Sequence, residues 1–439
     1  MVICEIEFFN NPLGIFYAGQ LISGQVVIKT DKTKPVKAVI LQIKGNAETH
    51  WSDTEYDPED QSNGESFNGH VDYLATRAYL HGSSSSIEVL IKPGTSTYRF
   101  ACQLPITCPS SFEATLGRIR YLVNVRFVRP WKFDQNFNRC FTVLKVMDLN
   151  SASLMLRVPS QVESQRTFCC FPCRSSPLSM RLSLPQGGFV PGQTVPVEVM
   201  VSNDSGVVVE DITVKLAMVV IYYSQPPCAD TNKDRFVMVQ KIGEGVSTKC
   251  RKQLTFDLKV PATPPTCFNL CSIIQIGYQV EAEARVKGCH GGQSLHIPIT
   301  IGSVPLTRQL QKEPKIWGED ALPQQLDAKA LILIGSEPVQ PEPLGPPTPW
   351  SADPSIAPPN YVAAKHICPD PQKFAKSKKK SQKKTGKGSQ EKKREDISFT
   401  PLYGVFDLSN QKEEIIVRPN EIKTDGGYVN DEVEKSTWL

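Results

Sequence analysis

Hydrophobic and polar residues alternate strictly in several segments of the chain up to about residue 306. Residues 278–286, which read YQVEAEARV, place an apolar or aromatic side chain at every second position. Residues 195–201 and 212–222 alternate in the same way. Because successive side chains of a strand point to opposite faces, each segment can bury one face of a sheet and expose the other. Long amphipathic helical patterns are absent from the sequence, so the pattern predicts antiparallel β-sandwiches.

The predicted strands form two copies of one pattern. Three short sequence matches between the copies, which we call marks, occur in the same order. The second mark has the form F-x-x-x-[LV]-P-x-x-x-P in both copies. The marks pair residues 17–28 with 190–201, residues 100–109 with 256–265, and residues 121–125 with 278–282. A repeat of this length predicts duplicated domains rather than a solenoid. The first copy is longer, and we expect its polar, acidic stretch at residues 51–69 to be an inserted loop.

Six blocks in these copies resemble those of the α-arrestins, the arrestin domain-containing proteins. In chain order they read NNPLGIFYAGQLISGQVVI, PSSFEATLGRIRYLVNVRFVRPW, FTVLKVMDLN, FVPGQTVPVEVMVSN, CSIIQIGYQVEA and IPITIGSVPL, within about residues 5–306. The resemblance implies an all-β fold: two tandem arrestin-type, immunoglobulin-like β-sandwiches followed by a disordered C-terminal tail. The expected boundaries are 1–152 for the N-domain, 153–175 for a connector, 176–306 for the C-domain and 307–439 for the tail.

The tail carries a short motif within a proline-rich segment. Nine of the 24 residues from 338 to 361 are proline, a composition that favours polyproline II and cannot bury a core. Pro358, Pro359 and Tyr361 fit the P-P-x-Y ligand of WW domains, in which the prolines stack in an aromatic groove and the tyrosine enters a neighbouring pocket. Asn360 occupies the position that points away. The motif also resembles the first PY motif of α-arrestin tails, so we predict that these three residues bind a WW domain.

A second segment, FTPLYGVFDL at residues 399–408, resembles the second PY motif of the family. It departs from the pattern because Thr400 stands where the first proline should be. Losing one stacking ring should weaken the contact, so Pro401 and Tyr403 are predicted to be at most an auxiliary WW site. The alternative is that this aromatic-rich segment packs back on the sandwich, and the sequence leaves both open.

The resemblance implies particular partners. They are HECT-type ubiquitin ligases with WW domains, and membrane receptors or transporters as cargo. The protein would then be an adaptor that promotes cargo ubiquitylation, endocytosis and endosomal transport. Two linked weak motifs could bind tandem WW domains tightly through effective concentration. The alternative is a ligase-independent trafficking scaffold or coat-like protein whose tail binds membrane or SH3 domains, which read P-x-x-P and do not need Tyr361.

The basic character of the chain belongs to one tail segment. The net charge is +4, but residues 373–394 contain eleven lysines and arginines and one glutamate, so the rest of the chain is acidic. This run is interpreted as a solvated linker or as a contact with an anionic membrane surface. A nuclear signal or a nucleic-acid site is the third alternative. We expect no nucleic-acid partner, because Phe374 is the one aromatic residue available there for base stacking.

Motifs that carry catalysis or bind cofactors are missing from the sequence. There is no P-loop, no H-E-x-x-H and no G-x-S-x-G, so we predict a protein that is not an enzyme, with no catalytic residues and no cofactor. Cys170 and Cys173 have zinc-like spacing, but a structural zinc site needs four ligands and a second C-x-x-C is absent. No metal site is predicted, and Cys169, Cys170 and Cys173 are read as reduced thiols, with palmitoylation as the alternative.

The sequence also bears on location. No apolar run approaches the ~18 residues of a membrane span, and the N-terminus does not read as a signal peptide. We therefore expect a cytoplasmic protein. The resemblance to the α-arrestins implies that it associates peripherally with the plasma membrane and endosomes.

Overall fold

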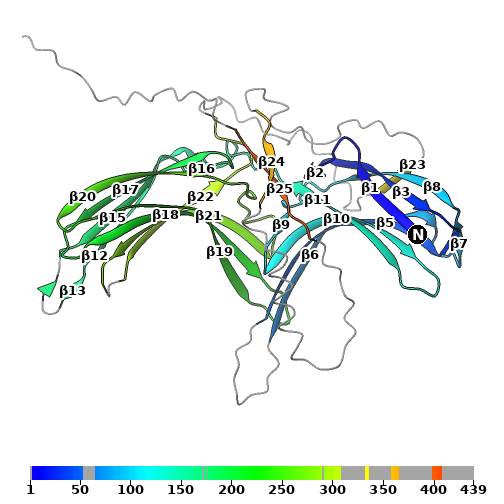
Figure 1. Ribbon diagram of the computed structural model, residues 1–439, viewed down its shortest axis with the longest axis horizontal. Helices are drawn as coiled ribbons and strands as arrows, with labels where there is room; N and C mark the ends of the chain where they lie inside the picture. The colour runs from blue at the N-terminus through cyan, green and yellow to red at the C-terminus, as the bar shows by residue number, and fades with distance from the viewer. Residues whose placement is uncertain are drawn as a thin grey trace, which may run out of the picture. The chain divides into compact units, whose positions relative to one another are not determined.

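The structure, a computed structural model, is built almost entirely of β-strands in the residues that it describes. These residues are 2–52, 65–170, 173–174, 176–288, 291–307, 332–335, 357–364 and 398–407. Within these ranges the helical element is one 3₁₀ turn, η1 (Leu154–Arg157). Alternating side chains that face a core on one side favour this outcome, and the predicted all-β fold of two sandwiches is confirmed (Figure 1).

The N-domain consists of two facing sheets. The first has the order β1 (Val2–Phe8), β3 (Leu21–Thr30), β8 (Gly94–Gln103) and β23 (Ile332–Gly335). The second has the order β2 (Ile15–Tyr17), β11 (Gln135–Leu144), β10 (Gly117–Val128), β5 (Ala38–Ser52) and β6 (Ser66–Gly82). The short β9 (Phe112–Glu113) pairs with β10, and β4 (Lys34–Val36) pairs with β7 (Val89–Ile91).

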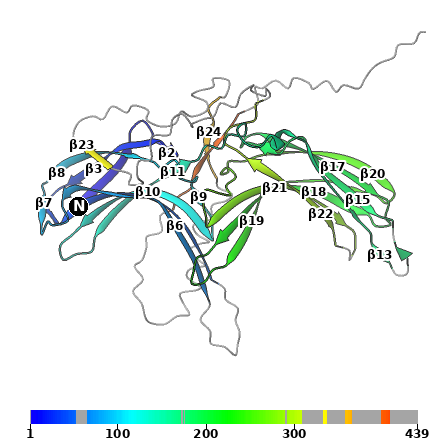
Figure 2. The ribbon, with the colours of Figure 1, turned by 180° about the vertical axis from the view of Figure 1, so that it is seen from behind.

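The C-domain repeats this plan. Its first sheet has the order β12 (Ser160–Arg166), β15 (Leu178–Leu184), β17 (Thr194–Asn203) and β20 (Cys250–Lys259). Its second sheet, whose β18, β19, β21 and β22 are labelled in Figure 2, has the order β16 (Gly188–Phe189), β22 (Gln293–Ile301), β21 (Ile274–Val286), β18 (Val209–Tyr223) and β19 (Thr231–Val246). A short hairpin, β13 (Cys169–Cys170) and β14 (Cys173–Arg174), precedes β15.

The duplication read from the sequence is confirmed by the order of the strands. In both domains the larger sheet begins with a short strand that pairs in parallel with the last long strand, β2 with β11 and β16 with β22. A tight turn follows each short strand and contains a glycine with positive φ, +88° at Gly19 and +94° at Gly192. Only glycine adopts this backbone conformation without strain, which explains why Gly-Gln recurs in the first mark of both copies, as Gly19-Gln20 and Gly192-Gln193.

The predicted alternation sets the two cores. Val195, Val197, Val199 and Val201 of β17 are fully buried, whereas Met200 between them is 40% exposed. In the N-domain three phenylalanines, Phe8, Phe16 and Phe141, meet edge to face with ring centroids 5.2–5.8 Å apart. Such pairs stabilise a core beyond the area that they bury.

Two boundaries differ from the sequence-based expectation. Residues 160–166, placed in the connector, form β12 and pair with β15, because Val162 lies opposite Leu182 and extends the C-domain sheet. The loop expected at residues 51–69 is shorter, since Trp51 and Ser52 are the last residues of β5 and residues 66–69 begin β6. The Trp51 and Phe67 rings stack at 5.6 Å and shield each other from water, which lengthens this hairpin. Residues 53–64 of this stretch lie outside the described part of the chain.

Three short strands of the tail also depart from the expected lack of folding. They are β23, which extends the first N-domain sheet, β24 (Asn360–Ala363) and β25 (Leu402–Val405). Pairing satisfies the backbone groups that a proline-rich segment would otherwise leave to water. The basic run at residues 373–394 lies outside the described residues.

Each sandwich contains the same buried hydrogen bond. The Tyr121 hydroxyl donates to the carbonyl of Pro109 at 2.8 Å, and the Tyr278 hydroxyl donates to the carbonyl of Pro264 at 2.6 Å. Both tyrosines belong to the third mark of the repeat. Each bond ties a long central strand to the proline-containing segment that precedes it, where the ladder has ended.

Replacing Tyr121 or Tyr278 by Phe should lower the free energy of unfolding of its own domain by about 1–3 kcal/mol, because a buried carbonyl loses its donor. Urea denaturation followed by hydrogen exchange and mass spectrometry would resolve the two domains. Tyr79→Phe is the control, since Tyr79 is half-buried and the described residues provide its hydroxyl with no hydrogen bond. Equal stability of all three variants would contradict this role.

Candidate functional site

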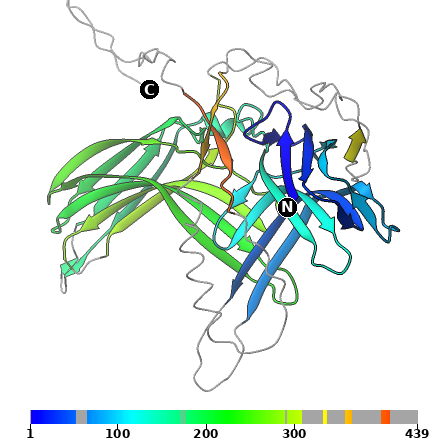
Figure 3. The same ribbon diagram turned by 45° about the vertical axis from the view of Figure 1, so that its right-hand side comes forward.

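The two tyrosine motifs of the tail meet in one hairpin. β24 and β25 pair antiparallel, with Tyr361 opposite Gly404 and Val362 opposite Tyr403. The amide of Ala364 donates to the carbonyl of Pro401 at 3.4 Å and continues the pairing by one step. Figures 1 and 3 show β24 and β25 side by side, in orange and red. We call residues 357–364 and 398–407 the tail hairpin.

One face of the tail hairpin is buried against the sandwiches, and the other is open. Alternation along each strand separates the two faces. The side chains of Pro359, Ala364, Pro401, Tyr403 and Phe406 are buried, whereas those of Pro358, Asn360 and Val362 are exposed. Tyr361 lies between these classes and is half-buried. The hairpin therefore behaves as a small amphipathic sheet docked on a groove.

Tyr403 is the most deeply inserted tyrosine of the tail hairpin, with 3% of its surface exposed. Its hydroxyl donates to the carbonyl of Ser111 at 2.8 Å. Next to it, the amide of Leu402 donates to the hydroxyl of Thr142 at 3.3 Å. Ser111 and Thr142 both belong to the N-domain and are buried. Tyr403 is thus held at its hydroxyl, and the backbone next to it is held at the amide of Leu402.

Tyr361 makes a different contact. Its hydroxyl and that of Tyr17, at the end of β2, form a hydrogen bond of 2.9 Å. Burial raises the pKa of Tyr17, and the neighbouring Tyr361 adds to the effect; burial also raises the pKa of Tyr361. Both phenols therefore stay neutral at physiological pH. Their contact is a hydrogen bond between two uncharged hydroxyls.

Phe406 attaches the hairpin to the C-domain. Its amide donates to the carbonyl of Pro191 at 2.9 Å. Its backbone lies directly against Gly192, where an added Cβ would collide with the Phe406 carbonyl. Gly192 is the glycine with φ +94° in the repeated turn. A side chain at this position would block the approach as well as strain the turn.

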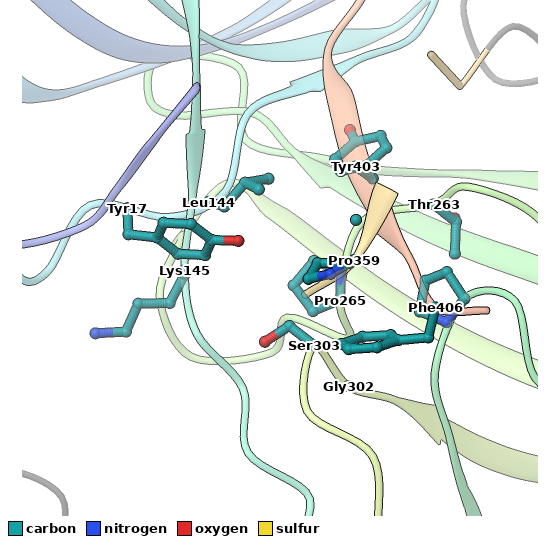
Figure 4. A pocket seen from close by; sticks show the side chains of 12 residues that line it. Tyr17, Leu144, Lys145, Thr263, Pro265, Gly302, Ser303, Pro359, Tyr403 and Phe406 are labelled. Atoms are coloured by element: carbon teal, nitrogen blue, oxygen red, sulfur yellow. The ribbon is translucent and has the colours of Figure 1, made fainter. Parts of the chain in front are cut away.

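The groove that receives the hairpin has walls from both domains. The N-domain and C-domain walls are joined by the amide of Met147, which donates to the Ser303 hydroxyl at 2.7 Å. We call this surface the interdomain groove; it is lined by Tyr17, Leu144, Lys145, Pro191, Thr263, Pro265, Gly302 and Ser303. Figure 4 shows Pro359 of the hairpin beside Pro265, with Tyr403 and Phe406 in the same groove. The cavity left between groove and hairpin measures about 20 Å³, the scale of a single water molecule.

The structure thus brings together all the residues predicted as WW ligands. Pro358 remains exposed, while Pro359, Pro401 and Tyr403 are buried and Tyr361 is half-buried. Burial of Tyr403 agrees with the alternative that the second motif packs back on the sandwich. Sequence reasoning missed Tyr17, Ser111 and the Pro191–Gly192 turn as partners of the tail. The available signal was the repeated glycine turn, but it gave no indication of what would pack on it.

Two cysteines of the N-domain, Cys102 and Cys108, are buried thiols. Burial raises the pKa of Cys102 to about 12 and that of Cys108 to about 11, so both remain protonated thiols. Within those same ranges no group of three or more His, Cys, Asp or Glu side chains is placed to hold a metal ion. The side chains of Cys169, Cys170 and Cys173 lie outside the described set. A search of the described residues for a helix able to span a membrane finds none.

Replacing Tyr403 by Phe should loosen the tail hairpin, because the variant leaves the buried carbonyl of Ser111 without a donor. A loss of about 1–3 kcal/mol corresponds to exchange of the β24 and β25 amides faster by roughly fivefold to 150-fold. Hydrogen exchange of the full chain measures this, with Tyr79→Phe as the control. Unchanged exchange in Tyr403→Phe would show that this bond does not hold the hairpin.

Comparison with known proteins places this architecture. Residues 4–150 match the family described as Arrestin (or S-antigen), N-terminal domain, and residues 174–306 match the C-terminal domain of the same family. Arrestin domain-containing protein 17 of Caenorhabditis elegans is 28% identical over 69% of this chain and 71% of its own length. Arrestin domain-containing protein 4 of Mus musculus is 23% identical over 84% of both chains, and the thioredoxin-interacting protein of Sus scrofa is 22% identical over 67% of this chain and 73% of its own. With both arrestin domains in the family order and the repeated sandwich in place, this chain belongs to the α-arrestin family, the arrestin domain-containing proteins.

Proposed function

We propose that this protein is an adaptor that links membrane cargo to HECT-type ubiquitin ligases through WW domains. In this role the two arrestin domains hold a receptor or transporter, and the tail brings the ligase. Ubiquitylation of the cargo then promotes endocytosis and endosomal transport. The arrestin-domain relatives support a trafficking adaptor role in general. The ligase and its WW domains are proposed from the tail motif.

The observation that carries the proposal is Pro358-Pro359-Asn360-Tyr361 on an extended segment behind two arrestin domains. A WW ligand needs an extended backbone with two adjacent proline rings and a tyrosine three positions after the first proline. Asn360 is exposed and occupies the position of the motif whose side chain points away from the WW domain. The motif thus has the chemistry of the ligand and a backbone that needs little reordering.

In the proposed role the protein acts by binding other molecules and catalyses no reaction of its own. Its location would be cytoplasmic, with peripheral association at the plasma membrane and endosomes through cargo. The basic run at residues 373–394 is proposed to add contact with an anionic membrane surface. No cofactor or nucleic acid is needed for this role.

Tyr361→Ala should abolish binding of the full chain to WW domains, because the tyrosine pocket is left empty and its contacts are lost. A pull-down with purified WW domains measures this, and Asn360→Ala is the matched control, since it changes the free position of the same motif. SH3 domains form a second arm of the experiment.

Two outcomes would contradict the proposal. In the first, Tyr361→Ala retains WW binding, so the motif is not the ligand. In the second, wild-type protein binds SH3 domains and not WW domains, and Tyr361→Ala has no effect; this result would favour the ligase-independent scaffold.

Phosphorylation of Tyr361 should weaken WW binding by roughly tenfold or more, because a phosphate of charge −1.5 to −2 cannot enter an apolar pocket unpaired. Titration of a WW domain with a peptide of residues 353–365, plain and phosphorylated, measures the effect. Equal affinity of the two peptides would contradict it.

A further inference from the structure

We propose that the interdomain groove is a binding site for the chain's own tyrosine motifs, and that a WW domain can take Pro358–Tyr361 only after the tail hairpin has left the groove. The Thr400–Tyr403 segment then serves as the anchor of the docked state rather than as a second WW ligand. This inference rests on the proposed function, because it concerns access to the same motif.

The docked hairpin hides the atoms that a WW domain reads. The Pro359 ring is buried in the groove, and the Tyr361 hydroxyl is paired with Tyr17. The backbone from Asn360 to Ala363 is paired along β25. A WW domain must cover the second proline and the tyrosine ring. Docking and WW binding therefore use the same surface of Pro359 and Tyr361 and exclude each other.

The contacts of the hairpin with the sandwiches are concentrated on β25 and the residues after it. Tyr403 donates to Ser111, Leu402 donates to Thr142, and Phe406 donates to Pro191. The β24 side of the hairpin reaches the sandwiches through the Tyr361 hydroxyl and through the buried side chains of Pro359 and Ala364. β24 is paired along its whole length with β25, so a change in β25 should release the P-P-x-Y motif without altering it.

The degenerate second motif fits the anchoring role. Its tyrosine is the buried one, and its hydroxyl supplies a donor to the carbonyl of Ser111 inside the N-domain. The first motif, whose sequence fits a WW domain fully, has a tyrosine that is only half-buried and an exposed Pro358. The two motifs therefore have different roles: Tyr403 binds in the groove, and Tyr361 is available to bind a partner once the hairpin has left the groove.

Gly404 offers a way to separate docking from recognition. It lies opposite Tyr361 in the hairpin, and a Cβ added there would lie 3.0 Å from Cγ of Pro359. The two methyl groups of valine would crowd this contact further and displace Pro359, while residues 358–361 stay unchanged. Gly206 is the matched control, because it is exposed and a Cβ added there meets nothing within 4 Å.

The test is titration of one purified WW domain of a HECT-type ligase with three full chains and one peptide. The chains are wild type, Gly404→Val and Gly206→Val, and the peptide spans residues 353–365. The peptide should bind at least about tenfold tighter than the wild-type chain, because the apparent affinity falls with the fraction of undocked motif. Gly404→Val should close most of this gap, and Gly206→Val should match wild type. Tyr17→Phe, which removes one hydroxyl, should give a smaller gain in the same direction.

Three results would overturn the inference. Equal affinity of the peptide and the wild-type chain would show that docking hides nothing. If Gly404→Val and Tyr17→Phe both bind as weakly as wild type while the peptide binds tightly, docking is not the cause of the weaker binding of the full chain. If the double variant Tyr361→Ala, Gly404→Val keeps the gain in affinity, the WW domain binds at Tyr403 and not at Tyr361. Failure of the peptide itself to bind would instead remove the proposed function, and the inference with it.

Discussion

The buried segment Pro109–Ser111 is the constraint on which the site depends. It lies between strands, so its polar groups must find partners inside the protein. Tyr121 donates to the carbonyl of Pro109, and the amides of Val143 and Lys145 donate to the hydroxyls of Ser111 and Ser110. The carbonyl of Ser111 accepts from Tyr403 of the tail. The tail thus supplies a hydrogen bond to a buried segment that belongs to the N-domain core.

This dependence links the fold to the proposed function. The same repeated turn that closes each sandwich presents Tyr17 in one copy and Pro191–Gly192 in the other, and both contact the tail hairpin. Duplication therefore gives the groove its two walls, and in the C-domain wall only glycine at position 192 permits the close approach of the hairpin backbone. In the proposed adaptor, the motif that we propose to bind WW domains is held by the same domains that would hold cargo. The phenols at this contact stay neutral, so the contact is one of shape and hydrogen bonding rather than charge.

The sequence predicted the sandwiches because their determinants are local and repeated. Val195 to Val201 and Tyr278 to Val286 alternate within a few residues, and the two copies reinforce each other. The docked hairpin could not be predicted in the same way, since Tyr361 meets Tyr17 and Tyr403 meets Ser111 across hundreds of residues of sequence. Its proline content indicated an unfolded segment, and four-residue strands carry too little periodicity to outweigh that signal. The chemistry of the candidate motif could be read from Pro358, Pro359 and Tyr361, but their burial depends on surfaces that exist only after folding.

Hydrogen exchange of β25 in the full wild-type chain, with and without a saturating WW domain, shows whether the groove and the WW domain compete for the tail hairpin. Leu402–Val405 lies outside the P-P-x-Y motif, so it reports undocking rather than direct contact with the WW domain. These amides should be protected in the free protein and should lose protection when the WW domain binds Tyr361. Full protection of β25 in the saturated complex would contradict this competition.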